Sequence, residues 1–196
     1  NQVSIHPEFP QLLYNVPGSK KPYGTLKDIC EVEPNYSFIA SSRGVFLMGT
    51  PKNPALWEDT RFDKIFKLKG LNTRCQSVTY LKEEKQILYS SSNGTFILNE
   101  NAQPKALKFK EKPITANSLI AAEKRVFLAT PTHGILKYQN GAVQPLELER
   151  ALKSDYIIQL KLQGNELFVH HDQGLQVVNL ENKTVRDISF LEGVGN

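Results

Sequence analysis

The sequence lacks the patterns that mark common catalytic sites. It contains no G-x-S-x-G nucleophile elbow, no H-E-x-x-H zinc helix, no P-loop and no C-x-x-C pair. Neighbouring acidic residues occur at Glu83 and Glu84 and at Glu147 and Glu149. They fall in expected turns or connections, where we interpret them as solvated charge rather than as a carboxylate pair for glycoside hydrolysis. We therefore predict no catalytic residue, no metal site and no cofactor in this chain.

Long apolar runs are also missing. No stretch approaches the roughly 20 apolar residues that a membrane helix needs, and no signal-peptide pattern is present. We therefore predict no membrane insertion by this segment. The chain starts at Asn1 rather than at Met. We therefore expect that it is processed or excised, which allows for the removal of a targeting segment.

Cysteine and clustered positive charge are scarce too. Only Cys30 and Cys75 are present, and nothing in their spacing requires a disulfide. A pair formed in an oxidising compartment and two separate buried thiols both remain open, and the second is favoured because free cysteine is usually buried. The net charge is +4, but no basic run is longer than two residues. Nucleic-acid-binding surfaces cluster their positive charge, so we predict no nucleic-acid partner.

The sequence does contain a repeat, within a composition of 40% hydrophobic residues that is typical of globular proteins. Four segments share the order apolar strand, small or polar residues, glycine, apolar strand; they span 37–45, 87–95, 126–135 and 167–175. Their glycines are Gly44, Gly94, Gly134 and Gly174. The first spacing is the longest, which matches an insertion at 49–58. Because glycine tolerates positive φ, each unit is predicted to contain a β-hairpin that turns at the glycine.

Further strands are expected on both sides of each hairpin. The upstream strands are expected at 26–32, 77–81, 118–122 and 156–162, and the downstream strands at 64–68, 105–109, 143–146 and 184–188. Four strands in about 40 residues are typical of propeller blades. The predicted fold class is therefore all-β, a β-propeller of about four four-stranded blades that form part of a larger or incomplete ring. A sandwich or barrel would not repeat one hairpin pattern at near-constant spacing, and a helical solenoid would need a 3.6-residue period.

The repeat also suggests how the chain is divided. Blade 1 is expected at 25–72 with an inserted loop, blade 2 at 73–112, blade 3 at 113–150 and blade 4 at 151–190. Segment 1–24 is expected to hold an outer closing strand, at 9–16, and a linker, while 191–196 is expected to start a following blade. One turn of helix is expected at 146–154, between blades 3 and 4. An incomplete ring exposes strand edges, which favours self-association of the parent protein.

The units resemble the two-component regulator propeller repeat, which reads apolar, Trp, apolar, Gly, Thr, two variable residues, Gly, Leu. The Trp position holds Phe38, Leu88, Phe127 and Phe168, the first small position holds Ala40, Ser90 and Ala129, and the hydroxyl position holds Ser41, Ser91 and Thr130. The four repeat glycines take the second Gly position. The resemblance covers about residues 25–190, although no unit keeps the Trp or the first Gly.

Members of that family form the periplasmic sensor regions of membrane-spanning hybrid histidine kinases, often those that sense oligosaccharides. The resemblance implies a module on the periplasmic or extracellular side of a bacterial membrane protein. It implies a small-molecule ligand, such as an oligosaccharide, and signalling through dimerisation, with the kinase outside this chain. A non-catalytic scaffold for protein interactions at the cell surface remains the alternative.

Candidate ligand-binding residues lie at the hairpin turns. Arg43, Asn93, His133 and Gln173 each directly precede a repeat glycine. In a propeller these turns share one face with the connections between blades, and that face is a common ligand site by analogy of fold. The alternative interpretation is that all four are simply good turn formers.

Two further candidates depart from the repeat. In the fourth unit His170 and His171 replace the small and hydroxyl residues, so His171 is a candidate ligand contact; the alternative is a histidine packed between blades or capping the turn. Adjacent strand residues point to opposite faces, which argues against both binding one metal ion. Trp57 is the only tryptophan and lies in the insertion. There it would suit stacking on a sugar ring, unless it packs against the blade.

Overall fold

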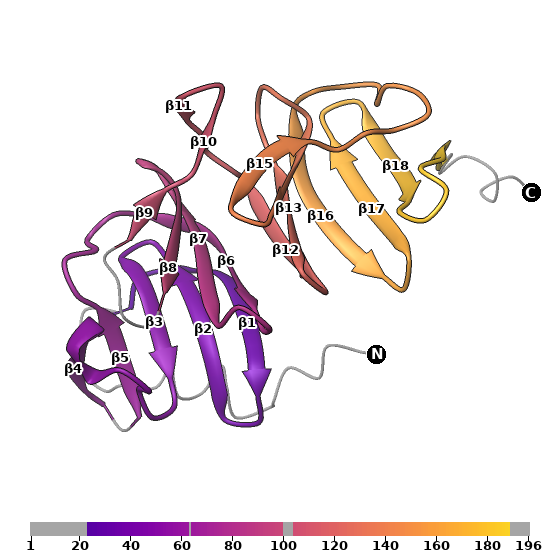
Figure 1. The fold of residues 1–196 in the computed structure, drawn as a ribbon. Coiled ribbons are helices and arrows are strands. Elements are labelled where there is room, and N and C mark those ends of the chain that lie inside the picture. The colour runs from indigo at the N-terminus through magenta and orange to yellow at the C-terminus, as the bar shows by residue number, and fades with distance from the viewer. Residues whose placement is uncertain (1–22, 63, 100–103, 189–196) are drawn as a thin grey trace, which may run out of the picture.

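The computed structural model describes residues 23–62, 64–99 and 104–188, which form antiparallel β-sheets and one short 3-10 helix. Four sheets of four or five strands follow one another along the chain, from the indigo to the yellow end in Figure 1. The predicted fold class, a partial β-propeller, is confirmed. The strand expected at 9–16 and the blade start expected at 191–196 lie outside the described residues.

Blade 1 has five strands rather than the expected four, in the order β1-β2-β3-β5-β4. They are β1 (Leu26–Glu33), β2 (Tyr36–Ser41), β3 (Gly44–Met48), β4 (Trp57–Phe62) and β5 (Ile65–Leu68), with the 3-10 helix η1 (Pro54–Leu56) before β4. The extra strand, β4, begins in the last two residues of the insertion at 49–58, which was expected to be a loop, and continues beyond it. The Asn53 side chain accepts a hydrogen bond from the Ala55 N–H at 3.0 Å and begins η1, which leads the chain into β4 at the edge of the sheet.

Blades 2, 3 and 4 have four strands each, paired in chain order. Blade 2 contains β6 (Cys75–Leu81), β7 (Gln86–Ser91), β8 (Gly94–Asn99) and β9 (Lys105–Ala106). Blade 3 contains β12 (Ser118–Ala122), β13 (Arg125–Ala129), β14 (Ile135–Gln139) and β15 (Ala142–Pro145). Blade 4 contains β16 (Ile157–Gln163), β17 (Glu166–His171), β18 (Gly174–Asn179) and β19 (Val185–Asp187).

The single strand expected at 105–109 is divided in the structure. β9 ends at Ala106, and β10 (Lys108–Phe109) pairs with β11 (Lys112–Pro113) in a separate hairpin. Backbone hydrogen bonds at this point explain the break. Leu107 still donates its N–H to the carbonyl of Thr95 in β8 at 2.8 Å, but the Thr95 N–H donates to the Ile114 carbonyl at 2.7 Å, so pairing with β8 ends there. The β10–β11 hairpin consequently stands out beyond the sheet of blade 2 (Figure 1).

The turn of helix expected at 146–154 does not form. This segment has no helix, and its leucines Leu146, Leu148 and Leu152 pack against the core between blades 3 and 4. The Glu149 N–H donates to the Lys183 carbonyl at 3.0 Å in place of an intrahelical partner. Tertiary burial of the leucines therefore outweighs their helix propensity.

The cores lie between neighbouring blades because strand residues alternate between the two faces of each sheet. Phe38, Val78 and Tyr89 belong to the core between blades 1 and 2. Leu88 and Leu128 belong to the next core, and further apolar residues of blades 3 and 4 form the third. A smaller cluster covers the other face of blade 1 and consists of Tyr23, Ile39, Phe46 and Ile65.

The inner strands β1, β6, β12 and β16 are joined by a ladder of hydrogen bonds from side chain to backbone. In each step a polar side chain of one blade accepts from a backbone N–H of the next blade. The steps run from Val78 N to Asp28 Oδ2 (3.1 Å), from Leu119 N to Ser77 Oγ (2.9 Å) and from Leu160 N to Ser118 Oγ (3.3 Å). Ser77 also donates its hydroxyl to Asp28. We call this series the inner-strand ladder.

The two cysteines do not form a disulfide. Cys75 is fully buried, and Cys30 is half-buried next to the core between blades 1 and 2. Burial raises the pKa of the Cys30 thiol to about 11 and that of the Cys75 thiol to about 12. The sequence left open a disulfide or two separate thiols, and the structure has two separate thiols.

Candidate functional site

One end of the molecule is formed by the glycine turns of the four blades and the segments that connect blades, and we call it the turn face. Three of the four turns are bonded to a segment that leads into a blade. The bonds run from Ser42 N to Thr25 O (2.9 Å), from Ser92 N to Arg74 O (3.1 Å) and from Gly134 N to Asp155 O (3.0 Å). The candidate residues Arg43, Asn93, His133 and Gln173 all lie on this face because they occupy equivalent turn positions.

A buried side chain caps every one of these turns. The Arg43 N–H donates to Ser41 Oγ (3.0 Å), Asn93 N–H to Ser91 Oγ (3.2 Å), His133 N–H to Thr130 Oγ1 (2.9 Å) and Gln173 N–H to His171 Nδ1 (3.1 Å). The four capping side chains are at most 2% exposed. The caps therefore fix the backbone of the four candidate residues, and the side chains of these candidates are exposed.

The four exposed side chains come from four different blades, so they are spread along the turn face. His133 has the most defined surroundings: its Nδ1 lies 2.7 Å from Thr132 Oγ1, and its ring meets that of Phe109 edge-on at 5.3 Å. Phe109 belongs to β10. Blade 3 and the β10–β11 hairpin thus meet on the turn face through an aromatic contact.

The β10–β11 hairpin is a functional candidate that the sequence analysis missed. It presents Lys108, Lys110 and Lys112 around Phe109, and all three lysines are exposed. The Lys110 ammonium lies 5.2 Å from the centre of the Phe109 ring. The available signal was the alternation of lysine with other residues from 108 to 112, which places basic side chains at every second position of a hairpin.

A groove of about 700 Å³ lies beside this hairpin, between blades 2 and 3. Ile97, Leu107 and Val143 give it apolar surface, and Lys105 and Lys108 line it with positive charge. The Tyr138 hydroxyl at its wall lies 3.4 Å from Gln86 Oε1. Burial, followed by the nearby Glu84 charge, raises the pKa of the Tyr138 phenol, which keeps this hydroxyl a hydrogen-bond donor. The groove is within the size range of small-molecule sites.

His171 is not placed as a ligand contact. Its side chain is 1% exposed, and it takes the position of the hydroxyl residues in the other blades, where its Nδ1 caps the turn. An accepting Nδ1 requires the proton on Nε2. Nε2 is itself buried, with no hydrogen-bond partner among the described residues. The exposed histidine of the pair is His170.

Trp57 is not an exposed stacking platform either. Its side chain is 6% exposed and stacks on Phe38, with ring centres 5.9 Å apart and an interplanar angle of 21°. It begins β4 and belongs to the core between blades 1 and 2. The alternative interpretation, a tryptophan packed against its own blade, replaces the prediction of a ligand-binding one.

In residues 23–62, 64–99 and 104–188, no group of three or more His, Cys, Asp or Glu side chains is arranged to hold a metal ion. No helix in the same ranges has the length and apolarity to cross a membrane.

No family model and no curated protein matches the sequence. Solved structures do match the fold. The extracellular domain of the hybrid two component system BT4673 from B. thetaiotaomicron is similar with a TM-score of 0.62 and 17% identity, over 87% of this chain and 23% of that one. The extracellular domain of BT3049, a hybrid two component system of the same organism, has a TM-score of 0.58 and 15% identity, over 85% of this chain and 25% of that one.

The WD40 β-propeller domain of Doa1 is similar as well, with a TM-score of 0.58 and 15% identity, over 88% of this chain and 56% of that one. The class defined by the fold is thus the β-propeller. Within it, the structural neighbours include the extracellular domains of hybrid two-component systems. This chain spans about a quarter of the length of those domains.

Proposed function

We propose that this chain is a ligand-sensing propeller module on the extracytoplasmic side of a bacterial two-component signalling protein. Its ligand is a small molecule such as an oligosaccharide, bound on the turn face and in the adjoining groove. Ligand binding produces a signal by changing the self-association of the parent protein. The module itself carries out no reaction.

The observation that supports this proposal most is the fold shared with extracellular domains of hybrid two-component systems. The turn face adds a second argument. Capped turns hold Arg43, Asn93, His133 and Gln173 in defined backbone positions while their side chains are exposed. Exposed polar groups near an aromatic ring and an apolar groove suit a sugar, which presents hydroxyls at its edges and C–H groups on its faces.

Calorimetric titration of the chain with a panel of neutral and acidic oligosaccharides tests the ligand. We expect saturable binding of one glycan class, weakened by His133→Ala and by Lys108→Ala. Lys64→Ala is the matched control, because this exposed lysine lies in the turn between β4 and β5 of blade 1, away from the glycine turns and from the residues that line the groove. Binding that is weakened equally by all three substitutions would place the ligand elsewhere.

Sedimentation of the complete extracytoplasmic region, with and without the identified glycan, tests the signalling step. A ligand-dependent change in the monomer–dimer equilibrium is expected. If no glycan binds and a protein partner is captured by the same face, the module is a cell-surface scaffold, which is the alternative left open by the sequence.

A further inference from the structure

A second polar cavity lies between blades 3 and 4. It has a volume of about 120 Å³, and its charged lining comprises Arg125 and Lys137 from blade 3, Glu147 from the connecting segment and Lys183 from blade 4. Arg125 begins β13, directly after the turn between β12 and β13. This turn is at the end of blade 3 opposite the glycine turn, and no residue lines both this cavity and the groove between blades 2 and 3.

Arg125 has a donor that the described residues leave unused. Its guanidinium lies over the Phe127 ring, with Cζ 5.5 Å from the ring centre. The buried Nε has no hydrogen-bond partner within the described ranges. Its Nη2 lies 4.0 Å from a carboxylate oxygen of the well-exposed Glu123, which is too far for a hydrogen bond. A buried charged donor without an acceptor is costly.

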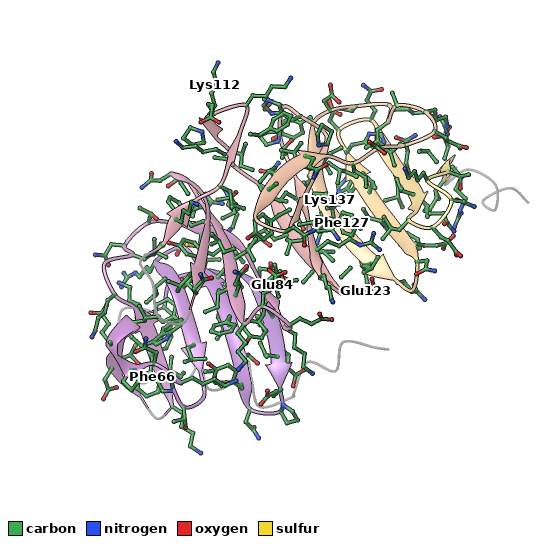
Figure 2. The ribbon with its side chains drawn as sticks, viewed as in Figure 1. Phe66, Glu84, Lys112, Glu123, Phe127 and Lys137 are labelled. Carbon is green, nitrogen blue, oxygen red and sulfur yellow. The ribbon has the colours of Figure 1, made fainter. Side chains whose placement is uncertain are left out.

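Lys137 adds a second cation on the same side of blade 3. It is the register partner of Phe127 on the adjacent strand, and Figure 2 labels both residues on the part of blade 3 near blade 4. Within the described part of the chain, no carboxylate oxygen lies within 4.0 Å of its Nζ. Lys137 is therefore held beside the cavity without a counter-charge in contact.

The third cation, Lys183, forms an ion pair with Glu147, which also lines the cavity. Lys183 Nζ lies 3.0 Å from Glu147 Oε2. This hydrogen bond, and more weakly the charge of Lys137, lowers the pKa of the Glu147 carboxyl. Glu147 is thus the single negative charge among three positive charges, and its side chain is 84% exposed.

We propose that this cavity binds an oxyanion group, for which Arg125 and Lys137 supply donors from blade 3 and Lys183 supplies one from blade 4. Guanidinium groups pair with carboxylate, sulfate and phosphate oxygens through charge-assisted hydrogen bonds. The bound oxyanion would connect blades 3 and 4 at the place where Arg125 and Lys137 have no acceptor from the protein.

The size of the cavity limits the occupant. Sites for whole small molecules have volumes of about 300–1,000 Å³, whereas this one has about 120 Å³. A single water needs only about 15 Å³ of such space. The occupant is therefore either a free oxyanion or the charged substituent of a larger molecule whose remainder stays in solvent.

Backbone-amide NMR titrations of the full chain test the proposal. Sodium sulfate is compared with sodium chloride at equal ionic strength, and glucose 6-sulfate is compared with glucose. We expect saturable sulfate-dependent shifts at blades 3 and 4, with a dissociation constant raised about tenfold by Arg125→Gln, which is the loss of one charged hydrogen bond. Lys124→Gln is the control, because it removes the same charge one residue away while its side chain pairs with Glu83 of blade 2.

Glu147→Gln distinguishes anion binding by the three cations from a structural role of these residues. The substitution removes the carboxylate that competes with sulfate for Lys183, so it should tighten sulfate binding about threefold. Tighter binding of glucose 6-sulfate than of sulfate identifies a substituent of a larger ligand, and equal binding identifies a free ion. Shifts that Arg125→Gln and Lys137→Gln both leave unchanged overturn the proposal, as does the lack of saturation in the folded wild type. Amide spectra of each variant establish that it is folded.

Discussion

Replacing Gly44 with alanine should destabilise the protein more than the same change at Gly174. The two glycines occupy equivalent turns and have nearly the same φ, 128° and 130°. An L-residue at such a φ costs on the order of 1–3 kcal/mol, and this cost is common to both sites. A Cβ at Gly44 would lie 2.5 Å from the Leu71 carbonyl oxygen, whereas one at Gly174 meets nothing within 4 Å.

The difference between the two variants therefore isolates the contact between a turn and the segment that connects blades 1 and 2. Displacing a packed backbone carbonyl is a case of overpacking, which costs about 1–3 kcal/mol. We expect the free energy of unfolding of Gly44→Ala to be lower than that of Gly174→Ala by about this amount.

Urea unfolding followed by fluorescence of Trp57 measures this difference, since that indole is buried in the core between blades 1 and 2. Gly94→Ala is a second control, because its φ is 134° and its nearest neighbour to a new Cβ lies at 3.6 Å. Equal losses at Gly44 and Gly174 would refute the close approach of the first turn to its connecting segment.

Three further predictions concern the interior. Ser77→Ala should lower the free energy of unfolding by about 1–3 kcal/mol, because it leaves the buried Leu119 N–H without an acceptor and removes one donor to Asp28; Ser92→Ala, at an exposed turn, is the control in urea unfolding. Burial raises the pKa of the Asp28 carboxyl above 3.8, so the folded state keeps the proton to higher pH than the unfolded chain. Stability should then fall as pH rises from 3.8 through the folded-state pKa, and Asp28→Asn should abolish this part of the dependence when unfolding is measured across that range. Burial also raises the pKa values of Cys30 and Cys75 to about 11 and about 12, so thiol reagents at neutral pH should modify neither until the protein unfolds, and fast labelling of the native state would contradict this.

The hairpins could be predicted from the sequence because each combines a glycine with two flanking apolar strands. The departures arise where a contact distant in sequence decides the local structure. The segment 105–109 has a strand composition, but the hydrogen bonds of Ile114 with Thr95 and Leu107 end its pairing with β8. Likewise, the leucines at 146–152 are good helix formers, and their burial between two blades holds the segment in an irregular conformation.

The candidate site was less accessible to sequence reasoning. The turn positions of Arg43 and His133 follow from the repeat, but the surroundings of His133 depend on a hairpin that the sequence did not predict. Trp57 and His171 were interpreted from residue type alone, as side chains suited to contact a ligand. Both are at most 6% exposed, because one stacks on Phe38 and the other replaces a capping hydroxyl. Residue type does not reveal which side of a strand faces a neighbouring blade.

In the inner-strand ladder, only one of the two blades in each step needs a particular side chain. Asp28, Ser77 and Ser118 must each supply an acceptor, but the group that they recognise is a backbone N–H, which every residue except proline provides. The receiving strand is thus free to change its side chains at the bonded position without losing the bond. A propeller joined in this way tolerates the duplication, exchange and divergence of blades, which is consistent with folds that stay alike when only about one residue in six is shared.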